Sequence, residues 1–330
     1  AIIGEAMEKL CIPPKVAVSL STVLAQQLYK KDADGRFTSQ SKTRPIGKQE
    51  RLVADMITPL ASGAARVVGQ YLRTQYSQYA ISTRSGGEAV NTGLQFRMDS
   101  SVHVVTVCCD CSNAFCRTDL VDELEAMQEF REEVRASGRP DAPALTEAAE
   151  TMMRDMVFWR AQGGRMVTVV DGQLQQMRLH CGEVQGGLYS MLRFAVFVAI
   201  RVVKPMLHDV ALQGAGVATR SIADDYTCQK EVRSKEDVVR LAQWVSEYNR
   251  LMLRNKQLNN VGKFTILQHP SAVGTEWDVE QYLGLCPVDA ETGRSPKVRR
   301  DAAVVNGVPV GWCAQARADE VVKVAEALAQ

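Results

Sequence analysis

Three aspartates at two places in the chain could do chemistry together. Asp110 follows the β-branched run VHVVTVCC, and the pair Asp224 and Asp225 stands at the middle of VATRSIADDYTCQKEV, where a hairpin is expected to turn. Mg²⁺ prefers oxygen ligands and is usually held by one or two carboxylates plus substrate phosphates. Two such ions, about 3.5–4 Å apart, stabilise the attacking and leaving oxygens of a phosphoryl displacement. If the two strand ends are neighbours, these carboxylates predict nucleotidyl transfer, although an acidic hairpin tip alone is more often simply solvated.

Four of the nine cysteines crowd around Asp110 in the stretch HVVTVCCDCSNAFC. Cys108 and Cys111 have the C-x₂-C spacing of a zinc site, but the chain has no second pair of this kind. Cys109 and Cys111 also share a side of the expected strand that Cys108 does not. Nine cysteines without a regular spacing predict free thiols in a reducing compartment, nuclear or cytoplasmic. We therefore interpret these cysteines as packing residues rather than zinc ligands.

The elements that must position the aspartates can be read from hydrophobic periodicity and turn residues. Apolar residues repeat every three or four positions in some segments, alternate or run together in others, and are separated by Gly-, Pro- and Asp-rich turns. The pattern predicts helices at 13–31, 56–72, 120–135, 145–162, 189–207 and 235–254, a turn at 32–36, a helix start at 85–98, a loop at 136–144, strands at 102–109 and 264–268, and hairpins at 165–182 and 217–232. This order predicts an α+β fold with helices on one face of an antiparallel sheet.

Composition bears on two classes of function, nucleic-acid binding and membrane association. The net charge is only +1, so the basic excess that often marks nucleic-acid-binding proteins is missing, although a local basic channel does not require it. The most apolar stretch, 191–207, is interrupted by Arg193, Arg201 and Lys204, and a membrane span needs about 20 uncharged residues. We expect a buried helix there and no membrane association. The chain opens without Met, which indicates a fragment or a processed piece.

Ordered sequence blocks give the chain a resemblance to the reverse transcriptases, most closely those of non-LTR, target-primed retrotransposons. The resemblance runs from about Lys30 to Gly284. Its blocks follow the order of the family motifs: KKDADGRFTSQSKTRPIG for the fingers segment, SGGEAVNTGLQFRM before the first catalytic strand, VVTVCCDCSNAF for motif A, RMVTVVDGQLQQMRLHCGEVQGGLYSMLRFAVF for motif B, IADD for motif C, LNNVGKFTIL for motif D and YLG for motif E.

The resemblance implies a right-hand polymerase fold. It places the fingers region with its N-terminal helices in residues 1–98, the palm with inserted fingers elements in 99–270, and motif E with the start of a thumb in 271–330. It also implies an RNA-directed DNA polymerase that adds dNTPs to the 3′-OH of a DNA primer on an RNA template, using two Mg²⁺ or Mn²⁺ ions.

The same resemblance implies functions for individual residues. Asp110, Asp224 and Asp225, with the backbone carbonyl of Cys111, would hold the metal ions. Phe115 would lie under the incoming sugar and exclude a 2′-hydroxyl, which argues against an RNA-dependent RNA polymerase. The remaining nucleotide-binding candidates are Gln185 and Gly186 from motif B, Lys263 from motif D near the leaving pyrophosphate, and Lys42, Arg44 and Arg51 as alternatives for holding the triphosphate.

The chain departs from the family pattern at two motifs. Leu188 and Met191 stand where motif B has prolines, and Ile222 stands where motif C has an aromatic residue. Such departures suit a divergent working polymerase, and they also suit an RNA-binding scaffold that has lost catalysis. The basic run GRSPKVRR at 293–300 is either a thumb segment that contacts a nucleic-acid backbone or a solvated loop. The native template, the insertion site and the oligomeric state have no signal in the sequence.

Overall fold

The protein forms two compact units. The structure is a computed structural model that describes residues 22–29, 43–48, 51–112, 114–161, 165–170, 173–178, 182, 187, 189–290, 292–306 and 308–329. The described residues of the first unit lie within Ala1–Gln70 and Phe115–Phe197, and those of the second within Tyr71–Ala114 and Val198–Gln330. The boundaries expected at residues 98 and 270 stay a prediction.

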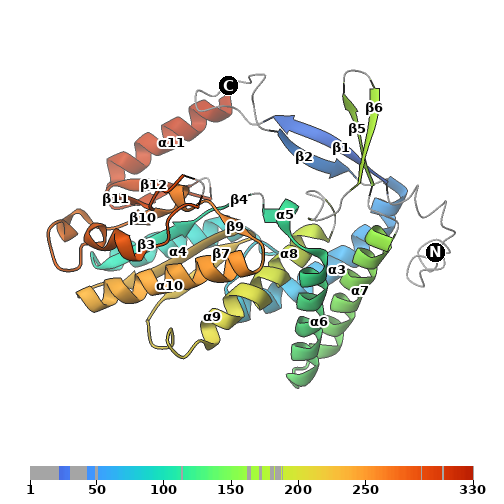
Figure 1. The fold of residues 1–330 in the computed structure, drawn as a ribbon, viewed down its shortest axis with the longest axis horizontal. Coiled ribbons are helices and arrows are strands. Elements are labelled where there is room, and N and C mark those ends of the chain that lie inside the picture. The colour runs from blue at the N-terminus through green and yellow to red at the C-terminus, as the bar shows by residue number, and fades with distance from the viewer. Residues whose placement is uncertain are drawn as a thin grey trace. The chain divides into compact units, whose positions relative to one another are not determined.

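A four-stranded sheet belongs to the first unit, with the strand order β2-β1-β5-β6 (Figure 1). Its strands are β1 (Thr22–Tyr29), β2 (Thr43–Lys48), β5 (Arg165–Val170) and β6 (Gln173–Arg178). β5 and β6 pair antiparallel from Arg165 opposite Arg178 to Val170 opposite Gln173. These strands confirm the predicted hairpin, whose expected Asp171-Gly172 turn lies outside the described residues.

The helix predicted for residues 13–31 is wrong where the structure describes it. Residues 22–29 form β1, which pairs antiparallel with β2 and parallel with β5. β5 pairs with Thr22–Leu24 and β2 pairs with Leu24–Tyr29, and such pairing overrides a weak local helical pattern. Residues 13–21 and the expected turn at 32–36 lie outside the described residues.

Helices of the first unit are joined by buried charges. α6 (Leu120–Ala136) begins at Asp119, whose side chain accepts hydrogen bonds from two backbone amides of the first turn. α7 (Ala142–Ala161) begins inside the loop expected at 136–144, and α8 (Ser190–Val198) follows the hairpin. Arg193 of α8 forms buried ion pairs with Glu123 of α6 and Asp155 of α7. These pairs fix the three helices against one another, because an unpaired buried charge is costly.

The second unit contains a five-stranded sheet with the order β11-β10-β3-β8-β7. The strands are β11 (Lys297–Arg299), β10 (Thr265–Leu267), β3 (Val104–Cys109), β8 (Asp225–Glu231) and β7 (Ala218–Ile222). β3 lies in the centre and runs antiparallel to both β8 and β10. The predicted strands at 102–109 and 264–268 and the predicted hairpin at 217–232 are confirmed.

Helices cover both faces of this sheet, so the prediction of helices on one face is wrong. The side-chain Nε2 of Gln229 on β8 donates to the carbonyl oxygen of Leu94 in α4 (Gly86–Ser100). Tyr226, three positions earlier, stacks on Tyr248 of α10 (Lys235–Arg254) and hydrogen-bonds Trp244 of the same helix. Residues at odd spacing along a strand face opposite sides. α4 and α10 therefore lie on opposite faces and bury β3 between them.

A C-terminal hairpin completes the core next to α4. β12 (Ala302–Val305) and β13 (Val308–Gly311) pack with Val90, Leu94 and Met98 of α4. Asn91 of α4 donates to the carbonyl oxygen of Val305 at 3.1 Å. The core behind the central strand therefore depends on residues near the end of the chain.

The remaining elements are helices and short segments. The helix predicted at 189–207 is present as α8, the π-helical turn η1 (Ala199–Val203) and α9 (Lys204–His208). Within the part of the chain that the structure describes, no helix is long and apolar enough to cross a membrane. The others are α3 (Arg51–Tyr76), β4 (Cys111–Ser112), α5 (Ala114–Arg117), β9 (Leu258–Asn259), η2 (Val261–Lys263), η3 (Pro270–Ala272), η4 (Val279–Leu285) and α11 (Ala314–Ala329).

Candidate active site

The predicted carboxylates lie at one end of two neighbouring strands. β3 and β8 are paired from Val104 opposite Glu231 to Cys109 opposite Tyr226. The next residue beyond that last pair is Asp110 on one strand and Asp225 on the other, so the register brings the two aspartates together. Asp224 lies in the two-residue loop between β7 and β8. The β3–β8 pairing therefore places all three aspartates at one edge of the sheet.

Lys263 lies beside Asp110. Its Nζ is 3.6 Å from Oδ2 of Asp110, and the two side chains are 63% and 41% exposed. The backbone brings them together, because the amide of Asn260 donates to the carbonyl oxygen of Asp110 at 2.9 Å. β4, which contains Cys111, also pairs antiparallel with β9, just before η2. A cation thus stands next to the central carboxylate of the candidate site.

A buried carboxylate supports the turn that carries Lys263. Oδ2 of Asp289 accepts a hydrogen bond from the Gly262 amide at 3.3 Å, and Oδ1 accepts from the amide and hydroxyl of Thr292. A Cβ on Gly262 would lie 3.3 Å from Cβ of Arg294, which leaves little room for a side chain. The loop at 289–294 therefore holds η2 in place. Nothing in the sequence around Asp289 distinguishes it from an ordinary loop aspartate, so sequence reasoning missed it.

The candidate site has the oxygen ligands that Mg²⁺ prefers, but the described residues do not form a group of three metal ligands. Asp110 and Asp225 supply hard oxygen donors from adjacent strand ends, which is the number of carboxylates that such sites commonly use. Among the described residues, no group of three or more His, Cys, Asp or Glu side chains is arranged to hold a metal ion. The residues present therefore provide a pair of carboxylates, Asp110 and Asp225. Asp224 lies next to this pair in the sequence but does not form a three-ligand group with it.

The cysteines near Asp110 are buried, neutral thiols. Burial, followed by the charge of Asp225, raises the pKa of Cys108 to about 12. Burial also raises the pKa of Cys109 and of Cys228 far above the usual thiol range. Cys108, Cys109, Cys111 and Cys228 are free of disulfides. Because thiolates rather than thiols ligate metals, these side chains act here as small packing residues.

Phe115 and two of the predicted fingers cations belong to the first unit, whereas the aspartates belong to the second. The Phe115 ring lies 4.7 Å from that of Phe194 in α8, measured between centroids, with the planes tilted by 36°. Arg44 lies in β2, and Arg51 is the first residue of α3. Lys42, Gln185 and Gly186 lie outside the described residues.

Two residues in the motifs that depart from the family pattern, Tyr189 and Ile222, pack inside the protein. Tyr189, in motif B, is buried, and burial followed by the charge of Asp155 raises its pKa. Ile222, in motif C, packs against the core cluster that contains Leu94 and Met98 of α4. Ile222 therefore helps to pack the hairpin that carries Asp224 against α4.

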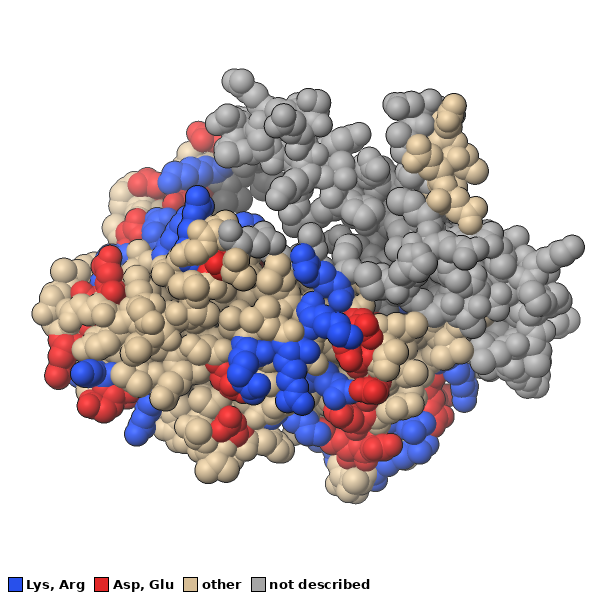
Figure 2. Space-filling model, viewed as in Figure 1, with Lys and Arg blue, Asp and Glu red and all other residues tan. Residues whose placement is uncertain are grey.

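The basic run at 293–300 is a partly exposed loop that continues into a strand, with Arg294 and Lys297 exposed. Its residues 297–299 form the edge strand β11, parallel to β10. Arg299 forms an ion pair with Asp301, and Arg300 contacts Asp278, Glu280 and Gln268. On the face drawn in Figure 2, basic and acidic side chains lie close together in several places. The two arginines are thus largely committed to contacts within the protein.

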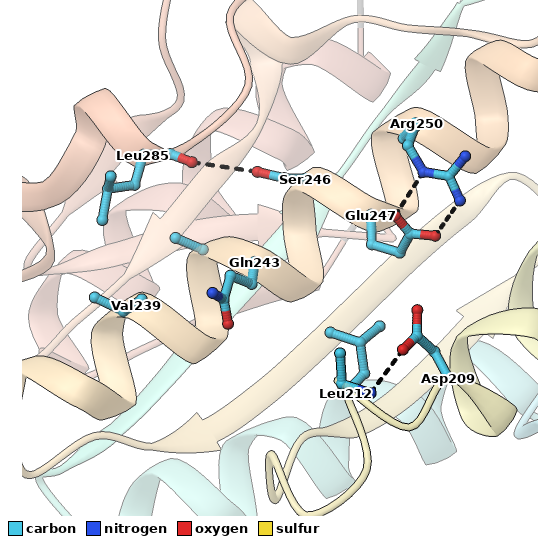
Figure 3. A pocket seen from close by; sticks show the side chains of 10 residues that line it. Asp209, Leu212, Val239, Gln243, Ser246, Glu247, Arg250 and Leu285 are labelled. Atoms are coloured by element: carbon cyan, nitrogen blue, oxygen red, sulfur yellow. Dashed lines mark hydrogen bonds and ion pairs between the residues drawn. The ribbon is translucent and has the colours of Figure 1, made fainter.

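A groove is lined mainly by residues of α10, together with Asp209, Leu212 and Leu285 (Figure 3). It has a volume of about 430 Å³ and is lined by apolar side chains, including Leu212, Val239 and Leu285. At its rim Glu247 and Arg250 form an ion pair, and Ser246 donates to the Leu285 carbonyl oxygen. Among the residues that the structure describes, none of those predicted for catalysis or nucleotide binding lines this groove.

Comparison with known proteins identifies the fold. No protein-family model and no curated protein matches the chain. Telomerase from Candida albicans, in complex with a TWJ fragment of telomeric RNA, matches with a TM-score of 0.51 and 12% identity, over 78% of this chain and 43% of that one. Telomerase from Candida tropicalis, also with a TWJ fragment, matches with a TM-score of 0.49 and 13% identity, over 75% of this chain and 41% of that one.

The fold is a reverse-transcriptase-like polymerase fold. The predicted α+β class, with a sheet backed by helices, is thereby confirmed, and the sheet of the second unit is antiparallel except for the β10–β11 pair. The chain spans 41–51% of the length of the telomerase chains it matches. At 12% identity the similarity carries the fold alone, so the chemistry has to be argued from the residues.

Proposed function

We propose that the chain is an RNA-directed DNA polymerase of a retroelement of the non-LTR kind. It adds dNTPs to the 3′-OH of a DNA primer on an RNA template. One observation carries the proposal: in a reverse-transcriptase-like fold, the register of β3 and β8 brings Asp110 next to Asp225, with Asp224 adjacent in the hairpin loop. The retroelement origin rests on the ordered sequence blocks, and the reducing compartment, nuclear or cytoplasmic, rests on the free thiols.

The proposed residue roles follow from position and charge. Asp110, Asp224 and Asp225, with the backbone carbonyl of Cys111, would hold two Mg²⁺ or Mn²⁺ ions. Bound there, the ions would stabilise charge on the attacking and leaving oxygens. Lys263 would neutralise phosphate oxygens near Asp110, since it already stands 3.6 Å from that carboxylate.

Further nucleotide and template contacts are proposed from the resemblance. Phe115 would select the deoxyribose, and Gln185 with Gly186 would contact the nucleotide or template. Lys42, Arg44 or Arg51 would hold the triphosphate, because guanidinium and ammonium groups neutralise phosphate oxygens. An RNA template as partner agrees with the fold match, since the telomerase of Candida albicans was solved with a fragment of telomeric RNA.

Primer extension tests the proposal. The chain is given a primed RNA, dNTPs and Mg²⁺ or Mn²⁺. We expect DNA synthesis that Asp224→Asn abolishes, with Asp99→Asn as a matched control on the exposed surface of α4. Robust synthesis by Asp224→Asn would contradict the assignment.

An RNA-binding scaffold is the second candidate function. It is favoured by the absence, among the described residues, of a three-ligand metal group, and by the ion pair between Lys263 and Asp110. A scaffold predicts RNA binding that weakens steeply with salt, without dNTP incorporation even in Mn²⁺. Incorporation by the wild-type chain excludes this alternative as the main function.

A further inference from the structure

The hairpin that carries Asp224 and Asp225 is built around an unfavourable backbone conformation. Ile222 and Asp225 are the last paired residues of β7 and β8, which leaves Ala223 and Asp224 as a two-residue loop. The turns preferred in such loops need a positive φ at the first loop residue, where Gly or Asn is usual. Here that residue is Ala223, with φ of 54°. An L-residue with a Cβ is held in this region only when its surroundings fix it.

Gln78 supplies the fixing contacts. This side chain is 2% exposed, and its Oε1 accepts hydrogen bonds at 3.0 Å from the amides of both Ala223 and Ala80. Its Nε2 donates to the carbonyl oxygen of Ala223 at 3.3 Å. One buried amide group therefore bonds both polar backbone groups of the residue with positive φ. It also ties that residue to the segment between α3 and α4.

The segment that presents Gln78 is itself fixed against the hairpin. The amide of Tyr79 donates to the carbonyl oxygen of Ser221, and the amide of Ser221 donates to that of Ser77. Gly86 follows, and a Cβ there would lie 2.2 Å from the carbonyl oxygen of Tyr79. The residues on either side of Gln78 are thus held against β7 by backbone hydrogen bonds, which fixes the position of Gln78 next to the hairpin.

We propose that Gln78 is a positioning residue for the aspartate site: by holding Ala223 at positive φ, it sets the direction in which Asp224 and Asp225 leave the hairpin. This inference rests on the proposed function, because it assigns Gln78 to the metal-binding step of that reaction. Without Gln78 the loop relaxes toward other turns, and the backbone that carries the two carboxylates no longer holds one conformation next to the end of β3. Metal affinity falls as a result, even while the sheet stays folded.

Mn²⁺ binding, followed by the electron paramagnetic resonance of the free ion, measures this directly in the full chain. Gln78→Met removes all three hydrogen bonds at similar side-chain length, whereas Gln78→Glu would set a carboxylate oxygen against the carbonyl oxygen of Ala223 in a buried place. We expect both variants to raise the Mn²⁺ concentration for half-saturation, Gln78→Met about tenfold, as the loss of one to two net hydrogen bonds implies.

The chain offers a matched control. Gln95 clamps Gly311 with the same pair of bonds, its Nε2 donating to the carbonyl oxygen and its Oε1 accepting from the amide, both at 3.0 Å. Gln95→Met should lower the unfolding midpoint yet leave half-saturation by Mn²⁺ within about twofold of wild type, since it disturbs β13 instead of the site. Equal half-saturation in Gln78→Met and wild type would overturn the inference.

A rescue and a metal-free measurement separate this inference from the proposed function. Glycine takes positive φ without strain, so Ala223→Gly should restore at least part of the Mn²⁺ affinity of Gln78→Met. Amide hydrogen exchange of residues 221–226 should become about tenfold faster in Gln78→Met and unchanged in Gln95→Met. Absence of both Mn²⁺ binding and DNA synthesis in wild type would reject the proposed function. Unchanged exchange in Gln78→Met would reject the clamp itself.

Discussion

The Asp289 carboxylate lies 3.3 Å from the amide nitrogen of Gly262, and the residue after Gly262 is the lysine that pairs with Asp110. A buried acid 27 residues further along the chain therefore holds the backbone turn from which Lys263 reaches the candidate site. Function and stability can be separated here, because Asp289 is buried and Lys263 is exposed.

Asp289→Asn should destabilise the second unit by about 1–3 kcal/mol, because an amide nitrogen or a weaker acceptor then faces the Gly262 amide in a buried place. Lys263→Ala should change the free energy of unfolding by less than about 1 kcal/mol, since its ion pair is exposed, while lowering dNTP incorporation. Urea unfolding of the two variants, with Thr292→Val as a milder control, checks the contrast. Equal stability of Asp289→Asn and wild type would contradict the support that we assign to this loop.

Gly86→Ala should destabilise the protein by about 1–3 kcal/mol through overpacking. Its Cβ would meet the backbone oxygen of Tyr79 at 2.2 Å, and a backbone atom cannot move aside as a side chain can. Gly87→Ala is the matched control, since the nearest atom to its Cβ is 3.8 Å away on Ile222. Alanine is also preferred to glycine within a helix, so Gly87→Ala should be neutral or stabilising by up to about 1 kcal/mol. Thermal unfolding of both variants gives the comparison.

Thiol labelling should distinguish the described cysteines by their surroundings. Cys313 is exposed, whereas burial raises the pKa of Cys286 to about 11 and that of Cys108 to about 12. Iodoacetamide reacts with thiolates, so under native conditions Cys313 should be modified well before Cys108, Cys109 or Cys228. Mass spectrometry of peptides over time measures the order, with labelling in denaturant as the reference. Native labelling of Cys108 as fast as that of Cys313 would contradict the packing role.

Acid should weaken the ion pair of Asp301 in a defined range. Hydrogen bonding from Arg299 holds the pKa of Asp301 at about 2, below its ordinary value of 3.8. The stabilisation is therefore complete above about pH 4 and is lost as the pH falls toward 2. Because both side chains are partly exposed, we expect a loss of about 1 kcal/mol or less. Asp301→Asn should show a smaller fall in unfolding free energy between pH 4 and pH 2 than wild type, and an equal fall would refute the assignment.

Much of the second unit could be predicted from local sequence. The helix expected at 235–254 has those bounds in the structure, and the strand before Asp110 and the hairpin with Asp224 are present. These segments have strong periodicity or β-branched runs, so the local pattern and the tertiary structure agree. The positive φ at Ala223 could also have been inferred, because a two-residue loop between paired strands requires it.

Other features could not be predicted because they depend on partners that are distant in sequence. β1 pairs with β5, whose residues lie more than a hundred positions later, and no pattern within TVLAQQLY reveals that partner. Gln78 is 145 residues from Ala223 and looks like any polar residue after a helix. The placement of helices on both faces of the sheet depends on which side each strand residue contacts, and only the tertiary structure settles that.

The hairpin of β12 and β13 has a practical consequence for anyone who shortens this chain. Motif E ends near Gly284, and a truncation planned from sequence motifs alone would stop close to that residue. Such a protein would lack Ala303, Val305 and Val310, and would leave the apolar side of α4 open to water behind the strand that leads to Asp110. The smallest piece that can be expressed with this strand fully covered therefore extends at least to Gly311, where Gln95 anchors the hairpin.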